Sequence, residues 1–174
     1  MGISKIKLSF ISLLMLFFIS VPSTSFSADD LFLGVGVGSD GISAARFAKK
    51  YDQGKFFDTS INKSAEIGIN FWDGDKVNSS SKSSNLSVTY SAILSKSFSN
   101  NFYLNSGMGI ALLSDDKIGE RNLGTSLQFE SRFGFGYKTT STSSSLNIFH
   151  YSNAGTANDN SGVNILMINL SHFF

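Results

Sequence analysis

From Leu31 to the end of the chain, apolar residues tend to alternate with glycine, serine, asparagine or charged residues. The clearest stretch has mostly serine and threonine between its apolar residues, which are Leu86, Val88, Tyr90, Ala92 and Leu94. Successive side chains of a β-strand point to opposite faces, so a period of two predicts strands with one apolar and one polar face. The pattern therefore predicts an all-β fold.

The alternation divides into eight segments separated by polar connections. We expect strands near residues 31–37, 42–51, 60–72, 85–97, 101–113, 124–138, 144–152 and 163–174. The second of these segments, ISAARFAKKYD, is also compatible with a short amphipathic helix. Eight strands make a small closed barrel whose interior is filled by side chains, so we expect no pore.

The apolar face of these strands fits two environments. It faces lipid in a transmembrane barrel, whereas it points inward in a soluble sandwich or lipocalin-like barrel. The last segment ends on an aromatic residue and has one face made of Leu166, Ile168, Leu170, His172 and Phe174. This ending resembles the sorting signature of bacterial outer-membrane barrels. We therefore expect an eight-stranded antiparallel transmembrane β-barrel in the bacterial outer membrane, with the soluble barrel as the alternative.

The start of the chain predicts a segment that is not part of the barrel. Lys5 and Lys7 precede an apolar run at 8–21, which is followed by a proline and small residues. This run is shorter than the about 20 residues of a membrane-spanning helix and is typical of a secretory signal peptide. We expect a signal peptide at 1–27 and an outer-membrane barrel at 28–174.

Composition excludes several kinds of site. The 174 residues include no cysteine, and the part after residue 27 carries 12 basic and 13 acidic residues. Without cysteine there is no disulfide or thiolate ligand, and without excess positive charge there is no surface for nucleic acid. The G-x-G-x-x-G at 36–41 is not followed by a βαβ unit, so it indicates a glycine-rich strand end and turn. We expect no metal, no cofactor and no nucleic-acid partner.

Four polar residues fall on the face opposite the apolar one. Glu130 and Arg132 share that face of their segment, as do Glu66 and Asn70 on another. Charges inside a small barrel must be paired or hydrogen-bonded, because little water reaches them. These residues therefore predict an interior polar network rather than a catalytic site.

His150 and Ser152 share the apolar face of their segment with Leu146 and Ile148. Polar groups are costly on a lipid-facing surface, so the pair indicates a functional site, the alternative being an interfacial pair near the headgroups. Residues two apart on a strand lie roughly 6.5 to 7 Å apart at the backbone, within reach of an imidazole. Since a serine nucleophile needs such a base, the spacing suits nucleophilic catalysis.

Neighbouring residues complete this candidate site. Asn153 and Gly155 follow the serine and can donate to a developing oxyanion, through a side-chain amide and a backbone amide respectively. If the last two strands form a hairpin around 156–161, Asn164 lies opposite His150 on the same face and is placed to orient its ring.

The C-terminal third carries a set of short motifs at characteristic spacing. They are Lys117-Ile118-Gly119, Asn122-Leu123-Gly124, Ser126-Leu127, Phe129-Glu130, Arg132, Gly134, Gly136, the block HYSNAG at 150–155, Gly162 and Phe174. This part of the chain resembles the PagL-type lipid A 3-O-deacylases, which are eight-stranded outer-membrane barrels that hydrolyse an acyl ester of lipopolysaccharide. In the N-terminal half only the general barrel pattern matches. The resemblance implies Ser152 as nucleophile, His150 as general base and Asn153 with Gly155 as the oxyanion hole.

The third catalytic position departs from the family pattern. The best-known members have a glutamate where this sequence has Asn164, two residues after Gly162. An asparagine can accept the imidazole N–H but carries no charge to stabilise imidazolium. We expect either a lower activity or an acid such as Asp159 in this role.

The sequence thus predicts an outer-membrane serine esterase that removes the 3-O-linked acyl chain from lipid A. Its partners would be lipopolysaccharide and the outer-membrane lipids, and a homo-oligomer is compatible with this function. A structural or adhesive outer-membrane barrel without catalytic activity is the alternative function.

Overall fold

The computed structural model describes residues 30–75 and 82–173, so the predicted signal peptide at 1–27 lies outside the described residues. The elements in chain order are β1 (Asp30–Gly38), the 3-10 helix η1 (Ser39–Gly41), β2 (Ser43–Lys55), β3 (Asn62–Asp75), β4 (Lys82–Ser97), β5 (Phe102–Leu113), β6 (Lys117–Ile118), β7 (Arg121–Asn122), β8 (Leu127–Lys138), β9 (Thr142–Ser152) and β10 (Val163–Phe173).

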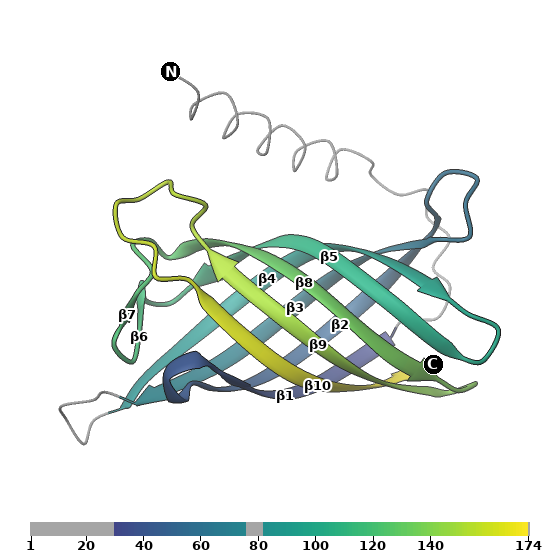
Figure 1. Ribbon diagram of the computed structural model, residues 1–174, viewed down its shortest axis with the longest axis horizontal. Coiled ribbons are helices and arrows are strands. Elements are labelled where there is room, and N and C mark those ends of the chain that lie inside the picture. Colours follow the sequence, from purple (N-terminus) through teal and green to yellow (C-terminus); the bar gives the residue numbers. More distant parts are fainter. Residues whose placement is uncertain (1–29, 76–81, 174) are drawn as a thin grey trace.

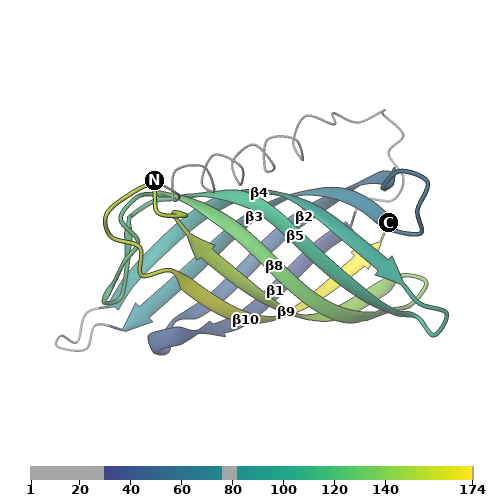
Figure 2. The same cartoon turned by 45° about the horizontal axis from the view of Figure 1, so that its top comes forward.

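Eight of these strands close into one antiparallel barrel, in the order β1-β10-β9-β8-β5-β4-β3-β2 (Figures 1 and 2). The fold class is confirmed, and each of the eight expected segments corresponds to one barrel strand. The segment that was also compatible with a helix is strand β2, which pairs with β1 over residues 43–50 and with β3 over residues 43–55. The small hairpin of β6 and β7 lies inside the connection between β5 and β8, where no strand was expected.

The two ends of the barrel carry connections of different length. The turns at 56–61, 98–101 and 139–141 lie at the end where β1 starts and β10 stops. The opposite end holds the longer connections at 114–126 and 153–162, which lie together at the left of Figure 1. Short periplasmic turns and longer outer loops are the usual arrangement of outer-membrane barrels, so we call these the turn end and the loop end.

The outer face of the barrel is apolar and the inner face is polar. Val88 is 51% exposed, whereas its neighbours Ser87 and Thr89 are each 1% exposed. Leu33, Ile168 and Leu170 are more than half exposed on other strands. A soluble barrel would bury this apolar set, so the soluble alternative is wrong. No helix among the described residues is long and apolar enough to cross a membrane.

A charged network fills the middle of the lumen. Arg46 on β2 donates to Glu66 at 2.7 Å, to Asn70 at 2.8 Å and to Glu130 at 3.1 Å. Arg132 donates to the same Glu66 oxygen at 2.9 Å. The interior network expected for four of these residues is confirmed. Arg46 itself was not expected, because its segment was also compatible with a short amphipathic helix.

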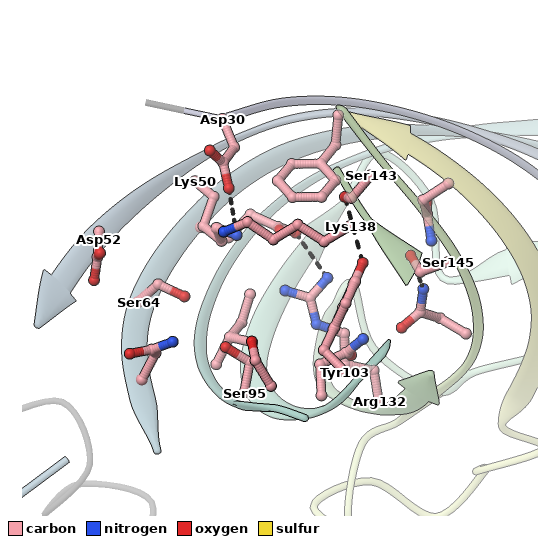
Figure 3. Close-up of a pocket in the computed structure, with 18 of the residues that line it drawn as sticks. Asp30, Lys50, Asp52, Ser64, Ser95, Tyr103, Arg132, Lys138, Ser143 and Ser145 are labelled. Atoms are coloured by element: carbon pink, nitrogen blue, oxygen red, sulfur yellow. Dashed lines mark hydrogen bonds and ion pairs between the residues drawn. The ribbon is translucent and has the colours of Figure 1, made fainter. Parts of the chain in front are cut away.

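The lumen differs on either side of this network. Toward the loop end, a buried apolar cluster includes Trp72, Phe149 and Tyr151 and is joined by Ile118 of the β6–β7 hairpin. Toward the turn end there is a cavity of about 330 Å³ with many polar lining residues, including Lys50 and Arg132 (Figure 3). The side chains of the charged network and of the apolar cluster are buried. They therefore fill the part of the lumen in which they lie.

Candidate active site

His150 and Ser152 lie on the outer face of β9, close to the loop end of the barrel. His150 is exposed, and Ser152 is half-buried as the last residue of the strand. Between them, Tyr151 points into the lumen, is 1% exposed and donates its hydroxyl to Glu130 at 2.9 Å. Because side chains alternate along a strand, anchoring Tyr151 inside holds His150 and Ser152 outside.

Asn164 on β10 is the cross-strand partner of His150. The Nδ1 atom of His150 and the Oδ1 atom of Asn164 are 2.8 Å apart. An amide oxygen only accepts hydrogen bonds, so Nδ1 carries the hydrogen and Nε2 is left to accept a proton. The hairpin register expected from the sequence therefore brings these two residues together.

Gly162 lies close to both His150 and Ser152. It has a φ of +58°, and a methyl group built on it would be 3.3 Å from His150 Cε1 and 3.9 Å from Ser152 Cβ. The imidazole edge and the serine are thus both within 4 Å of one point above Gly162. No hydrogen bond joins His150 to Ser152 in the described ranges, and such catalytic bonds often tighten only when substrate binds.

Asn153 is placed differently from the sequence-based expectation. Its side chain is fully buried, and its amide nitrogen donates to the carbonyl oxygens of Leu123 at 2.9 Å and Asp159 at 2.6 Å. Its Oδ1 atom accepts from the backbone N–H of Gly155 at 2.7 Å. Both donors assigned to an oxyanion hole are therefore engaged within the loop, and in this geometry Asn153 fastens the loop instead.

Asp159 does not approach the imidazole. Its carboxylate accepts a hydrogen bond from the side-chain amide of Asn122 at 2.7 Å, on the side of the β6–β7 hairpin. Of the two orienting partners considered for His150, the structure brings only Asn164 into contact with it.

Residues 30–75 and 82–173 contain no group of three His, Cys, Asp or Glu side chains placed to hold a metal ion. The second histidine, His172, pairs with Thr142 of β9 and Leu31 of β1 near the turn end. It thus lies at the opposite end of β10 from Asn164.

One feature of this site was not predicted from the sequence. Ala154 has a φ of +53°, a left-handed conformation that alanine adopts at a cost, and Gly155 follows with a φ of +74°. The two residues turn the chain sharply after Asn153. The backbone N–H of Ala154, two residues past Ser152, lies in this turn. The glycine was the only signal of this turn in the sequence.

The chain folds as a closed eight-stranded barrel with an apolar outer face. A serine, a histidine and an asparagine lie together on that face. These features define the class of outer-membrane barrel enzymes. A family model described as lipid A 3-O-deacylase (PagL) matches residues 44–173. The chain belongs to this PagL family.

Individual relatives agree with this assignment. The chain is 28% identical over 152 residues to the lipid A deacylase PagL of Pseudomonas aeruginosa, covering 83% of this chain and 86% of that protein. It is 30% identical to PagL of Bordetella bronchiseptica over 74 residues, 42% of each chain.

Solved structures support the same fold. The crystal structure of the outer membrane enzyme PagL superposes with a TM-score of 0.73 at 25% identity, covering 82% of this chain and 97% of that one. Neisserial surface protein A has a TM-score of 0.56 at 16% identity, covering 84% of this chain and 95% of that one, and shares the barrel fold.

Proposed function

We propose that this protein is an outer-membrane serine esterase that removes the 3-O-linked acyl chain from lipid A, with Ser152 as nucleophile and His150 as general base. The observation that carries the proposal is the 2.8 Å contact between His150 and Asn164 on the outer face of the barrel, beside Ser152. Membership of the lipid A 3-O-deacylase family supplies the substrate class.

The geometry supports a two-step hydrolysis. Ser152 Oγ attacks the ester carbonyl carbon while its proton passes to His150 Nε2. The ester C–O bond then breaks, and His150 returns the proton to the leaving 3-hydroxyl group of the sugar. A water molecule attacks the acyl-enzyme in the same way, which releases a 3-hydroxy fatty acid and regenerates the serine. Throughout, Asn164 holds the imidazole in the tautomer that leaves Nε2 available.

For the developing oxyanion we propose the backbone N–H of Ala154 as donor. Backbone amides near the nucleophile commonly stabilise such a charge, and Ala154 is an exposed residue in a left-handed turn directly after Asn153. Asn153 supports it indirectly, because its three side-chain contacts hold the turn in place.

The position of the site suits a substrate in the outer leaflet. His150 and Ser152 lie near the loop end, on the same outer surface as exposed Ile148 and Leu166. A lipid A acyl chain could lie against this apolar surface without entering the barrel, so lipid A and the outer-membrane lipids would share one face.

One chain supplies all three site residues, so the reaction does not require a homo-oligomer. We also propose that residues 1–27 are the signal peptide that directs export.

The test replaces each catalytic candidate separately, as Ser152→Ala and His150→Asn. Ser131 is a matched control, because it is the cross-strand neighbour of His150 on β8 and lies on the other side of the imidazole from Asn164. We expect Ser152→Ala and His150→Asn to lose about a thousandfold or more in kcat, and Ser131→Ala to stay close to wild type.

Lipid A extracted from cells that express each variant is analysed by mass spectrometry for loss of one acyl chain. Barrel folding is checked by the shift in gel mobility between heated and unheated samples. Full deacylation by correctly folded Ser152→Ala and His150→Asn would overturn the catalytic assignment. If the wild type leaves lipid A unchanged, the structural or adhesive alternative gains support.

A further inference from the structure

Three connections at the loop end meet at one arginine. Arg121 on β7 belongs to the connection between β5 and β8, and its Nη2 forms an ion pair of 2.6 Å with Asp40, between β1 and β2. Its Nη1 donates to the backbone oxygens of Ser161, at 3.0 Å, and Gly162, both in the connection between β9 and β10. The arginine thus fastens the start of β10 to two other connections.

The segment held by Arg121 borders the site directly. Gly162 lies against the imidazole of His150, and Asn164 follows two residues later with its 2.8 Å contact to Nδ1. A shift of residues 161 and 162 would therefore move both the surface behind the imidazole and the group that orients it.

The neutral partner of His150 makes this support more important. Hydrogen bonds with one charged group are roughly twice as strong as those between neutral groups, so an asparagine holds the imidazole less firmly than a carboxylate would. The orientation of the imidazole then depends more on where the backbone places Asn164.

We infer that Arg121 is a positioning residue for the proposed esterase, which holds Gly162 and the start of β10 so that Asn164 can orient His150. It acts through these groups and does not touch the reacting atoms. The carbonyl contacts carry this role rather than the ion pair, because Asp40 is 62% exposed at its side chain and Arg121 only 20%. The inference rests on the proposed function.

The first experiment compares Arg121→Gln, Arg121→Lys and Asp40→Asn, with Lys117→Gln as control on the same hairpin. Lys117 is exposed and its side chain makes none of these contacts. We expect Arg121→Gln to lower kcat about tenfold with KM changed less than about twofold, because misplacement of a catalytic group affects the chemical step. Arg121→Lys should recover part of the rate, since an ammonium can still donate to a carbonyl, and the other two variants should stay within about threefold of wild type.

The second experiment asks whether Arg121 acts through Asn164, by repeating Arg121→Gln in the Asn164→Glu background. A carboxylate holds the imidazole by itself, so there we expect Arg121→Gln to cost less than about threefold in kcat. Rates are measured on purified barrels with lipopolysaccharide as substrate, after folding is checked by gel mobility.

An equal loss in both backgrounds, or unchanged kcat in Arg121→Gln, would overturn the inference. If Arg121→Gln does not fold, the same comparison is made with Arg121→Lys, which keeps the charge. Ser152→Ala is measured in parallel. An inactive Ser152→Ala beside a fully active Arg121→Gln means that the inference fails while the proposed function stands, whereas an active Ser152→Ala means that the proposed function itself fails.

Discussion

At the scale of single residues, the unusual feature of the site is that an amide, not a carboxylate, orients His150. Asn164 Oδ1 lies 2.8 Å from His150 Nδ1, so it fixes the tautomer as an acid would. In the proposed reaction, it brings no negative charge against the imidazolium that forms when Ser152 gives up its proton. The proposed triad therefore has an orienting group for the imidazole but no negative charge to stabilise it.

Two substitutions at Asn164 separate these parts. Asn164→Glu should raise kcat about tenfold, because a carboxylate accepts the same hydrogen bond and stabilises the imidazolium. Asn164→Leu should lower kcat about a hundredfold, because the imidazole loses its acceptor and can rotate or take the other tautomer. Deacylation rates of purified, folded barrels give both values. Wild-type rates in Asn164→Leu would show that another group orients His150.

At the scale of elements, the site consists of the strand pair β9 and β10 and the connection at 153–162 between them. The sequence predicted the strand pair better than the connection. The outward placement of His150 and Ser152 follows from the period of two, and the pairing with Asn164 follows from a hairpin of the predicted length. Local pattern was sufficient there, because strand geometry leaves few alternatives.

The loop could not be predicted in the same way. The role of Asn153 depends on Leu123, thirty residues earlier, and that of Arg121 depends on carbonyl groups of residues 161 and 162. These are contacts between connections whose conformations no repeating pattern specifies. The hairpin of β6 and β7 was missed for the same reason, since two-residue strands show no alternation.

The loop and the strand pair meet at Gly162, where a substitution can be matched by a control. Gly162 and Gly54 both have positive φ, +58° and +83°, so an alanine at either position costs about 1 kcal/mol or more. Only at Gly162 would the added methyl lie 3.3 Å from His150 Cε1, since nothing lies within 4 Å of it at Gly54.

Gly162→Ala should therefore lower kcat about tenfold, whereas Gly54→Ala should leave kcat near wild type. Steady-state rates on lipopolysaccharide and urea unfolding of both variants separate the loss of activity from the shared loss of stability. Equal rates in the two variants would mean that the space beside the imidazole is not needed.

At the scale of the whole molecule, strand β9 connects the outer site to the ion pairs and hydrogen bonds inside the barrel. Glu130 accepts hydrogen bonds from Arg46 of β2, Ser91 of β4 and Tyr151 of β9. Its partner Tyr151 lies between His150 and Ser152 in the chain. The sequence indicated this network through the parity of Glu130 and Arg132, but which strands it joins is a consequence of closure, since β2 and β9 are not neighbours in the barrel.

Because the buried ion pair of Arg46 with Glu130 joins strands that are not neighbours, we expect the loss of Arg46 to destabilise the entire barrel. Arg46→Met removes the cation shared by Glu66 and Glu130 and leaves Glu130 without an ion-pair partner among residues 30–75 and 82–173. This change should lower the free energy of unfolding by about 3 to 5 kcal/mol. Glu66 retains Arg132, so the cost should fall on the Glu130 side of the network.

The control is Lys96→Met at an exposed position of β4, where we expect a change within about 0.5 kcal/mol. Urea titrations in lipid vesicles measure both. Equal stability of Arg46→Met and wild type would mean that water or packing, rather than the ion pairs, compensates the interior carboxylates.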